Sequence, residues 1–336
     1  MRGLYHIDKK EYFGIDYIKA FMAIIVIAIH TSPQSSIDNT LIKDSIHSLY
    51  NIAVPLFFIA SGFLTWNKIH NSTTSEKRNR LKGWIRKTAR IYIVWTAIYL
   101  PFTIYGFYLD DNSITKSGLI FIRNIVFVGE NYMSWPLWYL LGMLVAATII
   151  YFMVSLNFRQ RTMYITAITM AIIGVSLEYC HDNGFLQIIT NPYFRLFQTT
   201  RNGFFQGLPY IMIGISIAND GIIKSKKLLA GIILLGFVLQ MVGYQFASFI
   251  TSYALFSLII QIDFSEREDN LYYNYRMTST IIYLVHMLFV ASITILLPIK
   301  LPNYLLFLIV VILSIITAKT IIPHKENRIV KLLFRS

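Results

Sequence analysis

The chain has 336 residues, of which 55% are hydrophobic and 14% charged, and its mean hydropathy is +0.55. These values exclude a soluble globular domain of this length and indicate a polytopic membrane protein. The net charge of +13 does not indicate nucleic-acid binding, because most of the 30 Lys and Arg residues fall on one side of the predicted membrane topology.

Ten apolar segments approach the length of about twenty residues that crosses a bilayer. They predict an all-α integral membrane bundle of about ten helices, over the ranges 15–33, 46–66, 85–108, 137–156, 163–179, 204–218, 228–243, 246–263, 278–298 and 302–322. The apolar stretch 119–128 is too short to span, and we expect it at the interface. The whole chain, 1–336, is predicted to be one membrane domain.

The bias of Lys and Arg predicts that both termini are cytoplasmic, in a multi-pass protein of a bacterial-type plasma membrane. These termini are a segment over 1–14 and a basic tail over 323–336. The first helix is expected to remain rather than be cleaved as a signal peptide, because its apolar run is too long and no small-residue cleavage pattern follows it.

Several kinds of site are absent from the sequence. Cys180 is the only cysteine, so disulfides within the chain and cysteine-ligated metal sites are excluded. There is no Gly-rich phosphate loop and no His-Glu-x-x-His motif. We therefore expect no metal, and we expect no soluble catalytic domain.

The first predicted helix carries three polar side chains that hydrocarbon does not tolerate cheaply, Asp16, Lys19 and His30. Lys19 and His30 are eleven positions apart, so a helix places both on one face, roughly 16 Å apart along its axis. Two other readings stay open. Lys19 can extend its ammonium to the headgroups, and His30 can be a hydrogen-bonded histidine of the bundle interior.

The residues resemble acyltransferase family 3, a family of membrane acyltransferases. The resemblance rests on the Lys19 to His30 spacing, on Lys87 and Arg90 leading into the third helix, and on shorter motifs at 54–63, 138–139 and 283–286. Two positions depart from the family pattern: Lys19 stands where arginine is usual, and Pro136 stands where many members have histidine. Residues 28–33 and 200–205 are most similar to the membrane domains of membrane-bound serine racemases of vancomycin resistance.

The resemblance implies an enzyme that transfers acyl groups other than aminoacyl groups. It moves an acyl group, usually acetyl from cytoplasmic acetyl-CoA, to a hydroxyl of an extracytoplasmic carbohydrate or peptidoglycan-related acceptor. The basic side chains of Arg86, Lys87 and Arg90 suit the phosphates of the donor, although the same cluster also fits topology and contact with anionic lipid. His30 is expected to act as general base or to carry the acyl group. Asp16 is expected to orient Lys19, with a plain ion pair between them as the alternative.

The other side of the membrane carries candidates for contact with the acceptor, and the set consists of aromatic, acidic and basic residues: Glu130, Trp135, Trp138, Tyr139, Glu178, Arg201, Asn202 and His286. The aromatic members also fit an interfacial anchoring belt. Glu178 is expected to pair with an arginine near position 201. His286 is expected either to face the cavity or to make a structural hydrogen bond.

Two other functions are kept open. The similarity to serine racemase membrane domains favours a permease for a small amino acid such as serine, and an inactive scaffold for an envelope complex is the third possibility. Partners are therefore expected to be the lipid bilayer, acyl-CoA and the acceptor; the sequence does not predict an oligomeric state.

Overall fold

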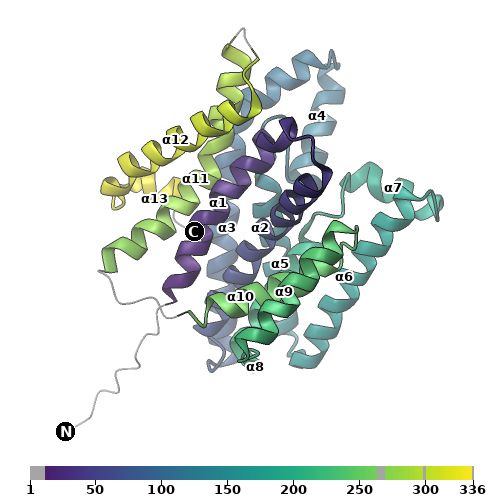
Figure 1. Ribbon diagram of the computed structural model, residues 1–336, viewed down its shortest axis with the longest axis vertical. Coiled ribbons are helices and arrows are strands. Elements are labelled where there is room, and N and C mark those ends of the chain that lie inside the picture. The colour runs from purple at the N-terminus through teal and green to yellow at the C-terminus, as the bar shows by residue number, and fades with distance from the viewer. Residues whose placement is uncertain (1–11, 263–268, 298–299, 335–336) are drawn as a thin grey trace.

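The computed structural model describes residues 12–262, 269–297 and 300–334. All of their regular secondary structure is helical, and the helices form a bundle (Figure 1). In chain order they are α1 (Phe13–Thr31), α2 (Thr40–Asn67), α3 (Thr74–Leu109), α4 (Ile114–Arg123), α5 (Leu137–Ser155), α6 (Gln160–Asp182), α7 (Gln187–Phe197), α8 (Leu208–Asp220), α9 (Lys226–Met241), α10 (Ala247–Ile259), α11 (Asp269–Leu296), α12 (Asn303–Ile321) and α13 (Arg328–Phe334). Most of the predicted N-terminal segment 1–14 lies outside the described residues.

Seven helices of the described chain are long and apolar enough to cross a membrane: α1, α2, α3, α5, α6, α11 and α12. Helices also form at the other three predicted positions, but α8, α9 and α10 have only 13, 16 and 13 residues. Helices thus form at all ten predicted positions, but seven of these helices are candidate spans, and α8 and α10 are shorter than the segments predicted for them. Most residues of α8 are buried, and an apolar helix of this length is typical of a segment packed inside a bundle.

Glycines bring α2 and α8 into close contact. A Cβ atom at Gly62 would lie 2.3 Å from the backbone oxygen of Ile211, and one at Gly214 would lie 2.1 Å from the backbone oxygen of Ile59. Only glycine therefore fits at either position without a shift of backbone. Close approach through small residues is how helices gain packing energy in lipid.

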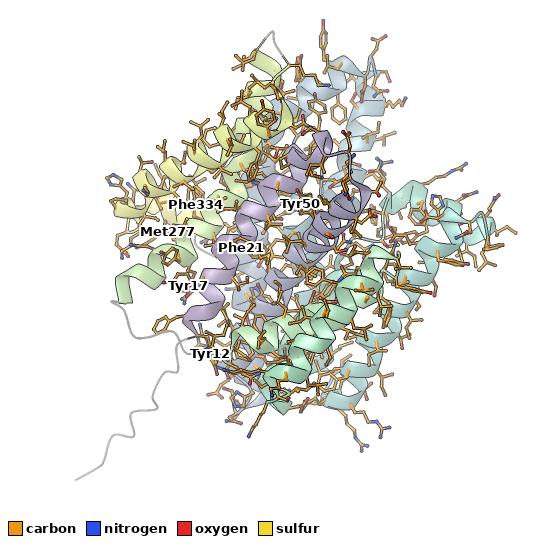
Figure 2. The ribbon with its side chains drawn as sticks, viewed as in Figure 1. Tyr12, Tyr17, Phe21, Tyr50, Met277 and Phe334 are labelled. Atoms are coloured by element: carbon orange, nitrogen blue, oxygen red, sulfur yellow. The ribbon has the colours of Figure 1, made fainter. Side chains whose placement is uncertain are left out.

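Helices α1 and α11 pack side by side (Figure 1). Asp16, near the start of α1, contacts Arg276, and His30, near the end of α1, lies beside His286, ten residues further along α11. The two helices therefore run in the same direction. Below, the two ends of the bundle are called the Asp16 end and the His30 end; Figure 2 labels Tyr12 towards the first and Tyr50 of α2 towards the second.

Two short helices do not span the bundle. The predicted interfacial segment forms the end of α4 and a π-helical turn, Asn124–Val128, and neither is among the candidate spans. The predicted basic tail includes helix α13, which packs on α3. The indole nitrogen of Trp95 donates to the carbonyl oxygen of Leu333 at 2.8 Å, and Phe334 is buried against the same tryptophan. This part of the tail is therefore a docked helix.

Candidate functional site

A cavity of about 640 Å³ opens at the His30 end of the bundle. Its walls come from α1, α2, α5, α6, α8, α9, α10 and α11 and from the segments after α1, before α5, before α8 and before α10. Four of the residues predicted as site residues line it, and they come from four separate segments of the chain: His30, Trp138, Glu178 and Arg201. The volume is in the range typical of small-molecule sites.

The imidazole of His30 lies between two other rings. Its centroid is 5.8 Å from the Trp135 indole and 5.4 Å from the His286 imidazole, and both contacts are stacked. Helix α1 has no Pro and no mid-helix Gly in its last four turns, so it continues unbroken to His30. This agrees with the helix predicted from the sequence. His30 is thus held by ring contacts while it still faces the cavity.

His286 is fully buried, and its hydrogen bonding determines its tautomer. Nδ1 lies 3.1 Å from the carbonyl oxygen of Ile282, which can only accept, so Nδ1 carries the hydrogen. In the neutral ring Nε2 is then an acceptor, and it has no hydrogen-bond partner among the described residues. Since unpaired buried acceptors are costly, this atom is a candidate for a functional contact beside His30.

Arg201 and Glu178 line the cavity but do not pair with each other. The carboxylate of Glu178 accepts a short hydrogen bond from the Thr200 hydroxyl, and no ion pair joins Glu178 to Arg201 within the described chain. This differs from the expected pairing. Arg201 is exposed, with its Nε 3.5 Å from the Thr199 hydroxyl, so its guanidinium remains available to an anionic group.

Asn202 has a structural role in the loop before α8. Its side-chain oxygen accepts from the backbone nitrogens of Phe204 and Phe205 at 3.0 and 3.2 Å, which caps the π-helical turn Gly203–Gly207. Its amide nitrogen donates to the Tyr193 hydroxyl at 2.7 Å. Both polar atoms are therefore used within the protein, and Asn202 is not among the residues that line the cavity.

Glu130 and Tyr139 lie near the cavity without lining it. Burial raises the pKa of the Glu130 carboxyl, and the positive charge of Arg201 partly opposes this shift. The Tyr139 hydroxyl lies 3.3 Å from that of Ser61, and its ring packs with those of Phe57, Phe58 and Tyr283. The position of Tyr139 is thus that of a packed core residue.

The Asp16 end holds a buried ion pair that differs from the expected one. Asp16, 2% exposed, accepts two hydrogen bonds from Arg276, at 3.0 Å from Nε and 2.8 Å from Nη2. Among the described residues no ion pair joins Asp16 to Lys19. The carboxylate therefore holds α1 against α11, and an orienting effect on Lys19 acts only at longer range.

The basic residues Arg86, Lys87 and Arg90 of α3 are exposed and lie outside the cavity. Arg90 and Trp95 are five residues apart, about 7.5 Å along the helix axis, so α13 docks close to this cluster. Lys19 lies on α1, and α11 packs against both α1 and α3. None of these candidate donor residues lines the cavity that His30 faces.

Sequence reasoning missed many polar residues of the cavity, and they include Gln34, His47, Tyr50, Tyr210, Gln240, Gln245 and Ser248. Gln240 had a detectable signal, because it is the one polar side chain in the apolar run 228–242. Gln34, Tyr210, Gln245 and Ser248 lie at or beside helix ends, where polar residues need no special explanation, whereas His47 and Tyr50 lie inside the first half of α2. Within the described ranges, no group of three His, Cys, Asp or Glu side chains is placed to hold a metal ion.

Membrane-length helices around a polar cavity define the class: a multi-pass membrane protein with a cavity between its helices. A family model described as an acyltransferase domain matches residues 12–321. The chain therefore belongs to this acyltransferase family, which confirms the resemblance carried by its motifs.

The curated relatives are racemases. One amino-acid racemase of Enterococcus faecalis is 31% identical over 216 residues, which are 63% of this chain and 29% of that protein. A second from the same organism is 25% identical over 70% of this chain and 33% of its own length. A serine/alanine racemase of Enterococcus gallinarum is 23% identical over 68% and 32%. The chain thus spans about a third of the length of these relatives. No solved structure matches it.

Proposed function

We propose that the protein is a membrane-bound acyltransferase that moves an acyl group, acetyl in the simplest case, from acyl-CoA to a hydroxyl of an acceptor bound in the cavity. The observation that carries the proposal is the placement of His30 in a chain of this family. Its imidazole faces a cavity large enough for a small acceptor and lies beside an unpaired nitrogen of His286.

In the proposed reaction, His30 removes the proton from the acceptor hydroxyl. The hydroxyl oxygen attacks the thioester carbonyl, a carbon–oxygen bond forms, and the carbon–sulfur bond breaks. The CoA sulfur leaves and takes the proton from the imidazolium, so the histidine returns to its neutral form. An acyl group carried briefly on His30 is the two-step version of the same transfer.

The donor is proposed to bind at the Asp16 end. CoA is polyanionic, and Arg86, Lys87 and Arg90 present three positive charges on the surface of α3. With this end in the cytoplasm, the thioester extends into the bundle towards His30, and the cavity opens to the outside of a bacterial plasma membrane. The acceptor is then a cell-envelope molecule, with a carbohydrate hydroxyl as the main candidate.

The test measures release of free CoA from acetyl-CoA by the purified full chain, with saccharide acceptors such as N-acetylglucosamine. His30→Ala should abolish acceptor-dependent release. His324→Ala, which changes an exposed histidine outside the cavity, should leave it unchanged. Acceptor-dependent release at the wild-type rate in the His30 variant would contradict the assignment.

A permease for a small amino acid is the second candidate function. It is favoured by the racemases among the relatives and by the presence of Arg201 and Glu178, one of each charge, in the same cavity. A permease should take up labelled L-serine into proteoliposomes with no acyl donor present, and Arg201→Ala should reduce this uptake. A scaffold would show neither uptake nor CoA release.

A further inference from the structure

The segment before α5 places the Trp135 indole against His30, and a circuit of contacts leads from His30 back to this segment. His30 stacks on both Trp135 and His286, at centroid distances of 5.8 and 5.4 Å. The rings of His286 and Tyr283 meet edge to face at 6.2 Å. The Tyr283 hydroxyl lies 2.7 Å from the carbonyl oxygen of Pro136, the residue that follows Trp135. The circuit therefore joins α1, α11 and the segment before α5.

The hydrogen of the Tyr283 hydroxyl is used inside the protein. A carbonyl oxygen can only accept, so Tyr283 donates to Pro136. Its side chain is 5% exposed, and its ring also packs against Tyr139, with centroids 5.4 Å apart. Tyr283 and His286 are three residues apart on α11, so they face the same side of that helix. Although Tyr283 lines the cavity, its hydrogen is not available to a ligand.

Hydrogen bonds within the segment before α5 hold its backbone in one conformation. The backbone nitrogen of Asn131 donates to the Ser134 hydroxyl at 2.8 Å, and this hydroxyl donates to the carbonyl oxygen of Asn131 at 3.1 Å. The Asn124 amide nitrogen donates to the side-chain oxygen of Asn131 at 3.1 Å. These three residues are buried. Trp135 is itself 36% exposed, so its position depends on the backbone that carries it.

The structure gives Trp135 a different place from Trp138. The sequence predicts both as contacts for the acceptor, and Trp138 lines the cavity, whereas Trp135 does not. The Trp135 indole lies against His30, which does line the cavity. An effect of Trp135 on the acceptor must therefore pass through the histidine.

The charge on His30 during the reaction gives the stack a chemical effect. In the proposed reaction the His30 imidazole takes the proton of the acceptor hydroxyl and becomes a cation. The face of an indole attracts a cation that lies within about 6 Å of its centroid, and more strongly where water is excluded. A neutral imidazole gains less from the same contact, so Trp135 stabilises the charged form over the neutral one. Such an interaction lowers the barrier and leaves the binding of the acceptor nearly unchanged.

We propose that Trp135 and Tyr283 are positioning residues for His30. Tyr283 holds the segment before α5 against α11, and Trp135, carried by that segment, covers the imidazole and stabilises its charged form. This role deepens the proposed function and rests on it, because the charge arises in the proposed transfer. Neither residue is assigned a bond to the acceptor or the donor. The stack exists without substrate, so it can be measured apart from the reaction.

Two variants of Trp135 separate the aromatic face from simple packing. Trp135→Leu removes the indole, and Trp135→Phe keeps an aromatic face. Phe127→Leu is the matched control, because Phe127 is 37% exposed, lies shortly before the same segment and packs edge to face with Phe197.

Tyr283→Phe removes the hydroxyl and keeps the ring. Its matched control is Tyr99→Phe, because the Tyr99 hydroxyl is also buried and donates to a backbone carbonyl oxygen, that of Leu284, at 2.8 Å. Both variants lose one buried hydrogen bond to α11 or to a segment packed on it, but only Tyr283 holds the segment that carries Trp135. The two phenylalanine variants change little volume, so they test the proposal even where Trp135→Leu does not fold.

The first measurement is NMR of the detergent-purified full chain, with histidine labelled at Cε1 and no substrate present. In the wild type the ring current of Trp135 shifts the His30 Cε1 proton upfield. Trp135→Leu should move this resonance downfield, and Tyr283→Phe should move it in the same direction. Phe127→Leu and Tyr99→Phe should leave it in place.

The second measurement is acceptor-dependent CoA release. Trp135→Leu should lower kcat about tenfold, as loss of a partly desolvated cation–π contact predicts, with the KM for the acceptor changed less than about twofold. Trp135→Phe should recover most of the rate, because a phenyl face also attracts a cation. Tyr283→Phe should lower kcat, whereas Tyr99→Phe should not.

The proposal is overturned if the His30 resonance stays in place in the folded Trp135 and Tyr283 variants, or if Trp135→Phe is as slow as Trp135→Leu. It is also overturned if Tyr99→Phe slows the reaction as much as Tyr283→Phe, or if Trp135→Leu raises the KM for the acceptor at unchanged kcat. The two hypotheses fail separately. A resonance that responds in a protein without CoA release would refute the transferase alone, and CoA release without that response would refute the positioning role alone.

Discussion

Replacing Arg276 by alanine should destabilise the protein more than replacing Asp16 by asparagine. The two residues form one bidentate ion pair, but their environments differ, because the Asp16 side chain is 2% exposed and the Arg276 side chain is 52% exposed. Loss of the arginine leaves a buried carboxylate with two lost hydrogen bonds. Loss of the carboxylate leaves a guanidinium that already reaches the surface.

The size of the effect follows from this asymmetry. Removing one partner of a fully buried pair costs about 3–5 kcal/mol, whereas exposed pairs contribute about 0–1 kcal/mol. With only the carboxylate buried, we expect Arg276→Ala to cost about 3 kcal/mol and Asp16→Asn about 1 kcal/mol. The double variant Asp16→Asn with Arg276→Ala should lie close to the single Asp16 variant, because no buried charge remains.

The assay is reversible unfolding in mixed detergent and SDS micelles, followed by circular dichroism, for the wild type, the two single variants and the double variant. A thermodynamic cycle isolates the coupling between the two residues, which we expect to be about 3 kcal/mol. Equal costs for the two single variants, or a double variant that loses the sum of both, would refute the reasoning. Either result would mean that the pair does not shield a buried charge.

Three further predictions concern the site. The Nε2 atom of His286 is predicted to support His30. His286→Gln keeps a polar atom at the position of Nε2, whereas His286→Asn mimics only Nδ1, so the glutamine variant should retain more CoA release. The reverse order would indicate a purely structural histidine. Replacing Lys87 and Arg90 together by alanine should weaken CoA binding in a salt-sensitive way, and unchanged affinity by equilibrium dialysis would limit the cluster to topology. Burial raises the folded-state pKa of Glu130, so the stability that this group contributes at low pH is lost as the pH rises. Glu130→Gln should therefore raise the Tm at pH 7.5 but not at pH 4. An equal rise in Tm at both pH values would contradict this.

Some candidate residues can be found in the sequence because their signal is local. Lys19 and His30 stand in one helix, and the cost of placing them in hydrocarbon marks them without any knowledge of the fold. The close packing of α2 could be anticipated from Gly62 for the same reason. The partner of Asp16 could not be predicted in this way, because Arg276 is 260 positions from it in the chain.

The lengths of α8 and α10 show a second limit. Apolar composition predicts where a helix forms, but it does not predict where the helix ends when the next turn is set by a cap or a glycine. Asn202 caps the π-helical turn before α8, and Gly243, with φ of 96°, lies in the turn between α9 and α10. These local bonds depend on neighbours that hydropathy does not report.

The sequence by itself determined the membrane class, the helical architecture, the family and the polar face of α1, because each depends on composition or on spacing within one segment. Only the tertiary structure decided which groups meet: Asp16 with Arg276, His30 with His286, and Tyr283 with Pro136 in the cavity lining. The physical reason is that a polar atom buried in a bundle must find its partner in space. That partner comes from whichever helix the packing brings near, at any distance along the chain.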